Sequence, residues 1–384
     1  MNLKVFLIGC ATVLVLAFLS LLIGGYVLYR RMASVSPGTP GRLQMPAGLK
    51  TPGVRVGKGF LKQDVFLTNP GLGKVTDIVW GELDPKPGLE LGIAGTDGAV
   101  FADKSASVKS SVNYGGNFDR VTIIDVEGDG ICEFIDRGSW ASKAALIDHK
   151  GRTLWRYGGM PGVDDMAAGD VDADGIKEFA VGFNGGGGVD LVDRNGKKRW
   201  NKPDGNVWHV EMVDMDDDGR DEIVHSNARG DITIRDSMGD TVFSESPGPY
   251  FSSFSLVRFP TETSQQYLLQ AEDDYTWLFD FNAKSVRKLP APDCGDLGDP
   301  FGAPVTLVKG KPPYLAVLVE YNNWNRSALY VYDPGGKLVY QEVIPEDCSA
   351  ITALALDNSG MQALLIGAPG KVLKYTARSP AGSQ

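Results

Sequence analysis

Three acidic stretches decide the fold of this chain: DVEGDGICE at residues 125–133, DVDADGIKE at residues 170–178 and DMDDDGRDE at residues 214–222. They begin 45 and then 44 residues apart. Each has carboxylates at its positions 1, 3, 5 and 9 and a glycine at position 6. A repeat of this length is typical of one β-propeller blade, so the spacing predicts one large toroidal all-β domain.

Each acidic stretch is followed by the same plan of strands and turns. An apolar strand, a glycine-containing turn, a second strand and a polar hairpin lead to an aromatic residue, which is Trp155, Trp200 or Phe243. Short β-branched runs between Gly and Asp turns are typical of strands. Further units with weaker or missing acidic stretches fit the plan near residues 82–102, 255–289, 305–343 and 354–375. We therefore predict seven blades, or six if one middle unit is drawn wrongly.

The acidic stretches predict three cation sites. Glycine at position 6 permits the sharp turn that lets the four carboxylates converge, and the backbone carbonyl at position 7 offers another oxygen. Such oxygen ligands suit Ca²⁺, and we expect three structural ions that relieve repulsion among the acids. The alternative is an Asp-rich turn that only caps its own backbone. The predicted ligands are Asp125, Glu127, Asp129, Ile131, Glu133, Asp170, Asp172, Asp174, Ile176, Glu178, Asp214, Asp216, Asp218, Arg220 and Glu222.

The net charge of −10 is explained by the same stretches. Their ligand positions 1, 3, 5 and 9 supply twelve of the 48 acidic residues, and the remaining 36 nearly balance the 38 Lys and Arg. No basic stripe that could follow a phosphate backbone occurs elsewhere in the sequence. The charge pattern therefore argues against a nucleic-acid partner.

The first 57 residues differ in composition from the rest. After a short tail at residues 1–4, residues 5–29 carry no charge and are rich in Leu, Val, Ile and Phe. As a helix they would be about 37 Å long, enough to span a hydrocarbon core of roughly 30 Å. We expect a transmembrane anchor, because the apolar region of a cleaved signal peptide is shorter. Residues 30–57 are rich in Pro and Gly and predict a linker, which leaves residues 58–384 for the propeller.

The orientation of this anchor follows from two opposing observations. Arg30, Arg31, Arg42 and Lys50 after the anchor favour a cytoplasmic propeller. Calcium sites of this kind fill more readily outside the cytoplasm, and long domains can translocate despite flanking charge. We expect a single-pass membrane protein with a periplasmic or extracellular propeller. The sequence leaves open whether Cys294 and Cys348 form a disulfide there.

Residues 166–183, MAAGDVDADGIKEFAVGF, resemble the FG-GAP or VCBS-type repeat of integrin α-subunit heads and bacterial surface proteins. Gly367, Ala368 and Pro369 repeat the "GAP" of that name. The resemblance implies four-stranded blades, calcium loops between blade strands, and an adhesive or scaffolding role. The "FG" element is missing before the three acidic stretches, and two units lack any acidic stretch, so no ligand-binding face is carried over.

These observations favour a protein- or glycan-binding module that serves adhesion or docks another subunit of a membrane complex. The aromatic residues that close the repeats are expected to pack between blades rather than bind a sugar or a quinone. The sequence YNNWNR at residues 321–326 suits recognition, although an ordinary polar hairpin is the alternative. His209 and His225 flank the third acidic stretch and are best explained by packing. An enzyme resembling a polysaccharide lyase or a quinone-dependent dehydrogenase is the rival, which an ionisable cluster in the central channel would favour.

Overall fold

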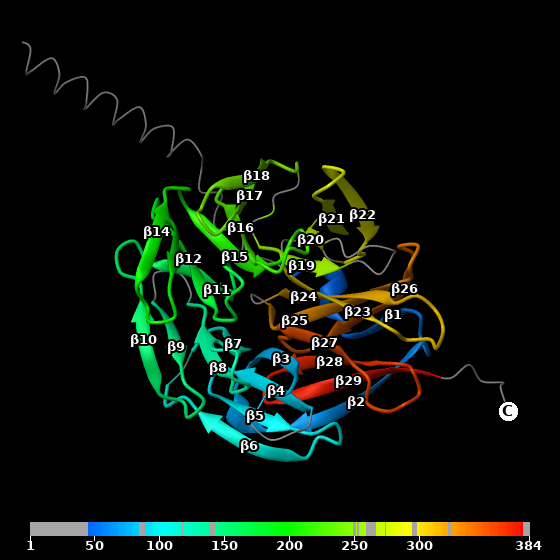
Figure 1. Cartoon of the computed structure of the whole chain (residues 1–384). Coiled ribbons are helices and arrows are strands. Elements are labelled where there is room, and N and C mark those ends of the chain that lie inside the picture. The colour runs from blue at the N-terminus through cyan, green and yellow to red at the C-terminus, as the bar shows by residue number, and fades with distance from the viewer. Residues whose placement is uncertain are drawn as a thin grey trace, which may run out of the picture. The chain divides into compact units, whose positions relative to one another are not determined.

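The computed structural model shows a ring of seven antiparallel β-sheets around a central channel (Figure 1). In each sheet the strands follow one another from the channel to the rim. This arrangement confirms the β-propeller, and seven blades is the larger of the two predicted counts. The structure describes residues 45–83, 89–116, 118–138, 143–248, 251, 253–258, 266–272, 274–293, 298–321 and 324–378.

The first four blades take their strands in sequence order. Blade 1 consists of β3 (Val75–Gly81), β4 (Glu90–Gly95), β5 (Gly98–Ala102) and β6 (Val108–Asn113), and blade 2 of β7 (Val121–Ile124), β8 (Glu133–Asp136), β9 (Ala144–Ile147) and β10 (Thr153–Tyr157). Blade 3 consists of β11 (Val163–Gly169), β12 (Glu178–Phe183), β13 (Gly188–Val192) and β14 (Lys198–Lys202), and blade 4 of β15 (Val207–Val213), β16 (Glu222–Asn227), β17 (Ile232–Arg235) and β18 (Thr241–Glu245).

The last three blades complete the ring. Blade 5 consists of β19 (Ser255–Arg258), β20 (Gln266–Glu272), β21 (Tyr275–Asp280) and β22 (Ser285–Pro290), and blade 6 of β23 (Asp299–Val305), β24 (Tyr314–Tyr321), β25 (Arg326–Tyr332) and β26 (Leu338–Ile344). Blade 7 consists of β27 (Ala350–Leu354), β28 (Ala363–Ala368), β29 (Lys371–Ala377) and, at the rim, β2 (Leu61–Thr68). Two short 3₁₀ helices, η1 (Ala47–Lys50) and η2 (Pro70–Leu72), flank β1 (Gly53–Val56) and β2.

The amino-terminal segment closes the ring. β2 pairs with β29 along its whole length, from Leu61 opposite Ala377 to Thr68 opposite Lys371. β1 adds a fifth strand to the outer edge of blade 6 by pairing with β26. The last blade therefore depends on a strand that precedes the first blade in the sequence.

The folded unit begins at Pro46, inside the linker predicted for residues 30–57. This is a correction at the end of that range, because Leu49 of η1 is fully buried and β1 belongs to a sheet. The predicted anchor at residues 5–29 and Cys294 lie outside the described residues. Among the described residues, no helix is both long and apolar enough to cross a membrane.

The second strand of a blade is apolar because neighbouring blades cover both of its faces. All six residues of β12 (EFAVGF) and of β28 (ALLIGA) are buried, while β14 at the rim (KRWNK) is largely exposed. Two glycines show how closely the blades approach. A Cβ on Gly182 would lie 2.6 Å from Val207 of blade 4, and one on Gly367 would lie 2.5 Å from Val75 of blade 1. The hydrophobic clusters accordingly form between blades.

The aromatic residues that close the repeats join neighbouring blades at the rim. Trp155 of blade 2 donates from Nε1 to the carbonyl of Arg194 in blade 3, at 2.9 Å. Trp200 makes the same bond to Ser237 in blade 4, at 3.0 Å. Phe243 stacks edge to face on a phenylalanine of blade 5. Interblade packing, as predicted for these residues, is confirmed.

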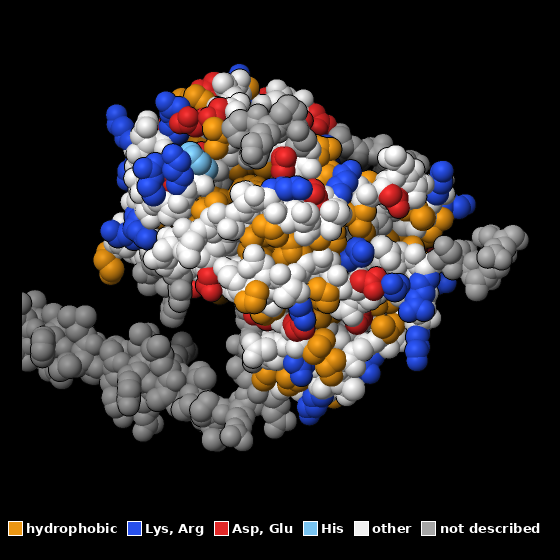
Figure 2. All heavy atoms as spheres, turned by 90° about the horizontal axis from the view of Figure 1, so that it is seen from below, with side chains coloured by type: hydrophobic (Ala, Val, Ile, Leu, Met, Phe, Trp, Pro, Cys, Tyr) orange, Lys and Arg blue, Asp and Glu red, His pale blue; other side chains and the backbone are white. Residues whose placement is uncertain are grey.

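On the side of blades 1 and 7, the rim carries small groups of apolar side chains separated by charged ones (Figure 2). The exposed apolar residues of these two blades include Val65 in β2 and Val108 in β6, which are 56% and 45% exposed. Isolated exposed residues of this kind are normal on a globular protein. The rim of these blades is therefore an ordinary mixed surface.

Candidate functional site

The three acidic stretches lie at one end of the ring. They are the loops β7–β8, β11–β12 and β15–β16, each of which joins the innermost strand of a blade to the next strand. Because the strands are antiparallel, the hairpins between the third and outer strands lie at the same end. We call this end the acidic face. The opposite end, where successive blades are connected, is called the channel face.

Each acidic loop is held by hydrogen bonds to its own carboxylates. In the second loop, Asp170 accepts the backbone N–H of Asp174 at 3.2 Å and of Gly175 at 2.8 Å. Gly175 has φ +85°, a conformation that favours glycine and makes the predicted turn. The Glu178 carboxylate at position 9 reaches back to the N–H of Val171 at 3.4 Å. The first and third loops repeat this pattern.

Two of the three loops bring acidic oxygens close enough to share one cation. Ligand atoms of Asp170, Asp172 and Glu178 lie within 4.8 Å of one another, as do those of Asp214, Asp216 and Asp218. Oxygen ligands at 2.3–2.6 Å from a calcium ion would be spaced on the order of these distances. Among the described residues, the first loop does not form such a group. The residues present in the second and third loops therefore fit a hard cation.

Arginine side chains already contact predicted ligand carboxylates in two of the loops. In the first, Glu127 pairs with Arg194 at 3.2 Å, which draws the position-3 carboxylate away. In the second, Arg199 contacts Asp172 at 3.0 Å and Glu178 at 2.6 Å. A guanidinium there partly supplies the charge that a metal ion would bring. The third loop has the ligand group with least competition from arginine.

The glutamates at position 9 experience the crowding most strongly. Burial raises the pKa of Glu133, Glu178 and Glu222 to about 7, and the neighbouring loop aspartates add to this. A bound cation would favour the ionised form and offset both effects. The residues at position 7 donate their N–H groups to the position-5 acids at 2.8 Å; these residues are Ile131, Ile176 and Arg220.

A cavity of about 1000 Å³ occupies the centre of the ring, toward the channel face. Every blade contributes to its wall through the innermost strand or the connection before it. One lining residue from each blade, in order, is Thr76, Thr122, Asp164, Trp208, Ser255, Pro300 and Ile351. A cavity that combines apolar and charged side chains from all repeats is the default place to look for a binding site.

One-residue bulges direct side chains into this cavity. The pairing of innermost strands β3, β11 and β15 with their neighbours slips by one residue at Thr76, Asp164 and Trp208. All three residues line the cavity. Bulges commonly re-aim side chains beside functional sites. The bulge of the innermost strand therefore places a different side chain in the channel in each of these three blades.

Behind the bulges lies a buried ionic network that we call the Asp165 clasp, consisting of Arg120, Arg137, Asp165, His209 and Glu211. Asp165 is fully buried and contacts Arg120 at 2.9 Å, Arg137 at 2.9 Å and His209 Nδ1 at 2.6 Å. Arg137 also reaches Glu211 at 3.2 Å. These residues come from blade 2, blade 3 and blade 4 or the connections before them. The clasp therefore joins three consecutive blades.

The charges in the clasp support one another. Burial alone would raise the pKa of Asp165, but Arg120, Arg137 and His209 hold it well below its usual value. Burial would lower the pKa of His209, but Asp165 and Glu211 raise it. The pKa of Glu211 is lowered, because Arg137 and His209 outweigh the effect of burial. The clasp is thus stable with its carboxylates ionised and His209 protonated.

A second ionic group joins blades 6, 7 and 1. Lys74, just before β3, contacts Glu320 at the end of β24, and it lies 2.9 Å from Asp347 in the connection to blade 7. Burial would lower the pKa of Lys74, but the two carboxylates raise it. This pairing reinforces the ring where the chain closes on itself.

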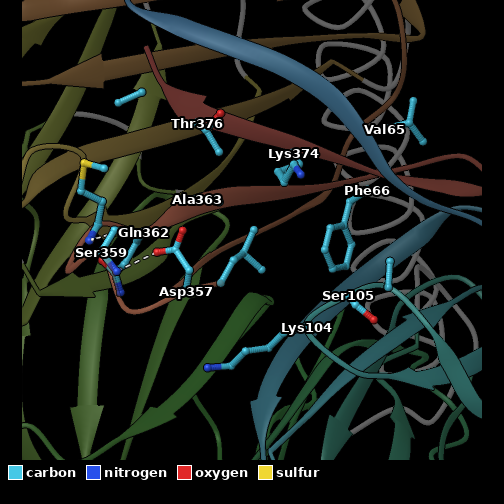
Figure 3. A pocket seen from close by; sticks show the side chains of 14 residues that line it. Val65, Phe66, Lys104, Ser105, Asp357, Ser359, Gln362, Ala363, Lys374 and Thr376 are labelled. Carbon is cyan, nitrogen blue, oxygen red and sulfur yellow. Dashed lines mark hydrogen bonds between the residues drawn. The ribbon is translucent and has the colours of Figure 1, made fainter. Parts of the chain in front are cut away.

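A smaller groove of about 470 Å³ lies at the rim between blades 7 and 1. Phe66 of β2, Lys104 of the β5–β6 hairpin and Asp357 of the β27–β28 loop lie around the same space (Figure 3). Similar grooves lie between blades 2 and 3 and between blades 4 and 5. The groove between blades 7 and 1 is therefore a general feature of how neighbouring blades pack.

Other residues singled out in the sequence have structural partners. His225 is buried with Nε2 3.0 Å from Asp204, and His209 belongs to the Asp165 clasp, so both are packing histidines with ionic partners. In the sequence YNNWNR, Tyr321 is buried and Arg326 donates to the carbonyl of Pro345 at 3.3 Å. Residues 322–323 lie outside the described part of the chain. The clasp residues Arg120, Arg137 and Asp165 were not foreseen.

Comparisons with known proteins agree on the architecture. No protein-family description matches the sequence, and no curated protein matches it. Among solved structures, the chain is similar to BBS1N in complex with ARL6DN, with a TM-score of 0.54, 12% identity, and coverage of 84% of this chain and 97% of that one. It is also similar to streptogramin B lyase, with a TM-score of 0.53, 9% identity, and coverage of 83% and 98%. At these identities the likeness shows the fold: a seven-bladed β-propeller.

Proposed function

We propose that this chain is a membrane-tethered, calcium-binding β-propeller of the non-cytoplasmic side that binds another protein or a glycan, with a protein partner as the first choice. The observation that carries the proposal is the channel face, where residues of all seven blades surround one cavity lined by charged and apolar side chains. A rigid ring that presents such a face suits docking. The similar BBS1N structure is a complex with another protein, which supports this choice.

The channel face also carries the most exposed apolar side chain among the described residues. Met160 lies in the connection from blade 2 to blade 3 and is 99% exposed. Methionine is enriched in the buried parts of protein interfaces. Met238 is 72% exposed and lies on a hairpin of the acidic face. The two residues therefore form a matched pair that tests which face is used.

We expect Met160→Glu to reduce the recovery of a cross-linked partner several-fold, because a charge in the contact area must be desolvated. Full-length protein is cross-linked in native membranes and its partners are identified by mass spectrometry. Met238→Glu should leave the recovery unchanged. If Met160→Glu retains the partner while Met238→Glu loses it, docking on the channel face is refuted. If a glycan rather than a protein is recovered, the second choice holds.

Calcium binding rests on the geometry of the second and third acidic loops. A ligand that binds only the folded state stabilises it by about 2.7 kcal/mol at a concentration one hundred times its dissociation constant. We therefore expect the melting temperature of the full-length protein in detergent to fall by several degrees when calcium is replaced by a chelator. Differential scanning calorimetry measures this change.

A matched substitution shows whether the acidic loops cause the shift. Asp214→Asn should remove part of the calcium effect, because the third loop has the least arginine competition. Asp357→Asn changes a carboxylate in the corresponding loop of blade 7, which lacks the ligand set, and should leave the effect intact. If the melting temperature of the unsubstituted protein is the same in calcium and in chelator, the proposal is refuted.

A second candidate is a propeller enzyme, and the specific observation in its favour is the ionisable cluster at the channel. Asp77, His209 and Glu211 all line the central cavity. Burial raises the pKa of Asp77 to about 6, near the range useful for proton transfer. In the Asp165 clasp, however, His209 is paired with Asp165, and Glu211 is paired with Arg137. This mutual pairing favours a structural role, so binding stays our first choice.

A further inference from the structure

The central cavity carries an excess of negative charge. Six carboxyl groups line it, on Asp77, Asp119, Asp164, Glu211, Asp299 and Glu320. The basic lining residues are Lys74, Arg120, Arg137 and His209. Each of these four already pairs with a carboxylate, either in the Asp165 clasp or in the second ionic group of Lys74, Glu320 and Asp347. The positive charges are therefore committed within the protein, and Asp164 takes part in neither of these two groups of ion pairs.

Asp164 is the acidic group best placed to receive one. It sits on the bulge of β11, and its Oδ1 is buried without a hydrogen-bond partner in the part of the chain that the structure describes. Ser255 Oγ, also on the cavity wall, is likewise buried without a hydrogen-bond partner among the described residues. Burial raises the pKa of Asp164 to about 6. Leaving a buried polar atom unpaired costs free energy that a bound donor would recover.

A third buried polar atom in the wall, Nε2 of His209, has no aligned hydrogen bond among the described residues. His209 is 6% exposed, and its Nε2 lies 3.2 Å from Glu211 without the alignment of a hydrogen bond. Phe254 packs edge to face against the same imidazole, with ring centroids 4.6 Å apart. The wall around Asp164 thus combines unsatisfied polar atoms with aromatic surface.

Trp208 adds an aromatic face that ligands can reach. It occupies the bulge of β15, the position equivalent to Asp164 on the neighbouring innermost strand, and it is 39% exposed. A cation over the face of an indole is attracted by the negative charge of the ring's π system. A carboxylate and an indole at equivalent bulges of neighbouring strands, both lining one cavity, suit a positively charged organic group.

The size of the cavity argues for an organic cation rather than a metal ion. Among the described residues, groups of three metal-binding side chains within reach of one ion occur in the acidic loops and not in this cavity. Its carboxylates come from several blades around a space of about 1000 Å³. Such a space accommodates an alkyl ammonium or guanidinium group together with its carbon chain.

We propose that the central cavity binds a protonated amine or guanidinium, with Asp164 as its ionic partner and Trp208 as its aromatic face. The cation could belong to a free polyamine or to a Lys or Arg side chain of a docked protein. The inference rests on the cavity alone, so it can hold or fail independently of the membrane anchor and of calcium binding. The inference bears on the proposed protein-binding function only if the cation is a Lys or Arg side chain of a docked protein.

Calorimetry on the full-length protein tests the proposal with two matched pairs of probes. Putrescine is compared with uncharged butane-1,4-diol, and the peptide acetyl-Gly-Lys-Gly-amide with its norleucine analogue. We expect binding of at least one charged probe and none of its neutral counterpart. Tighter binding of putrescine identifies a free amine, and tighter binding of the lysine peptide identifies a protein side chain. If neither charged probe binds, or if neutral analogues bind equally, the proposal is overturned.

Substitutions then locate the site. Asp164→Asn preserves the shape of the side chain and removes its charge, and it should weaken binding at least about tenfold, as expected for a lost charge-assisted contact. Asp64→Asn removes the same charge from β2 at the rim and should leave affinity unchanged. Circular dichroism verifies that both variants are folded, and Trp208→Leu provides a second reduction in affinity that does not depend on Asp164. Equal affinity in the unsubstituted protein and both cavity variants would place the cation elsewhere and overturn the assignment.

Discussion

Asp165→Ala should lower the free energy of unfolding of the propeller by about 3–5 kcal/mol, the usual cost of breaking a buried ion pair from one side. Asp165 is fully buried, and its removal leaves Arg137 and His209 without their shared carboxylate. It also removes the acceptor for the Val210 N–H in blade 4, at 3.0 Å. The midpoint of urea unfolding, followed by tryptophan fluorescence, measures the change.

Two other variants make this result specific. Asp165→Asn keeps the size of the side chain and should destabilise less than alanine. Asp64→Ala removes an aspartate that pairs with Lys62 on the surface, at 2.9 Å, and should have little effect because exposed pairs contribute little. Unfolding midpoints that coincide for the Asp165 and Asp64 variants would show that the clasp does not stabilise the ring.

The Asp165 clasp also predicts how the difference in stability between the unsubstituted protein and Asp165→Ala depends on pH. The pKa of His209 is raised above 6.5, so its contribution is complete below pH 6.5 and is lost as the pH rises through the folded-state pKa. The pKa values of Asp165 and Glu211 are lowered from 3.8 and 4.5, so their contributions are complete above pH 4.5 and are lost as the pH falls through the folded-state values. The unsubstituted protein should therefore exceed Asp165→Ala in stability most strongly between those two limits.

A chain that begins at Pro70, without β1 and β2, should fail to form a closed ring. β2 supplies the outer strand of blade 7, and its Leu61 and Leu67 are buried at 4% and 5% exposure. Burial of one leucine contributes about 1.5–3 kcal/mol, and the unpaired β29 would expose an edge that promotes aggregation. The combined loss is comparable to the whole stability of a typical domain, about 5–15 kcal/mol. Size-exclusion chromatography and circular dichroism report the outcome.

A chain that begins at Lys58 is the control for this truncation. It lacks η1 and β1 but keeps β2, and blade 6 retains four strands of its own. We expect a folded monomer of reduced stability, because the fully buried Leu49 is lost. A peptide of residues 58–69 added to the shorter chain should partly restore it. Cooperative unfolding of the shorter chain as a monomer would contradict the role assigned to β2.

The blades were predictable because their signal is local and periodic. Each acidic loop follows the innermost strand directly, so residues 125–133, 170–178 and 214–222 locate blades 2, 3 and 4 without any long-range information. Ring closure has no such signal. β2 pairs with β29 more than 300 residues away, and its sequence reads like any exposed strand after a Pro- and Gly-rich segment.

The candidate site in the channel was predictable only in part. Asp164 and Asp165 stand out as adjacent acids in an otherwise apolar strand, and His209 occupies the place in blade 4 that Asp165 has in blade 3. Comparing these equivalent residues of blades 3 and 4 could have identified the part of the innermost strand that lies at the channel. Arg137 could not be assigned to it, because it reaches Glu211 across blade 3, 74 residues along the chain. The bulges that turn Asp164 and Trp208 toward the cavity leave no sequence pattern of their own.

The fifth strand on blade 6 has a mechanical consequence. Any tension that enters the folded unit through its amino-terminal end meets β1 before β2. β1 is attached to blade 6, whereas β2 completes blade 7. A pull can therefore detach β1 and lengthen the chain while every blade keeps four strands. We therefore expect β1 to detach under load before β2, so that the closure of the ring is lost last.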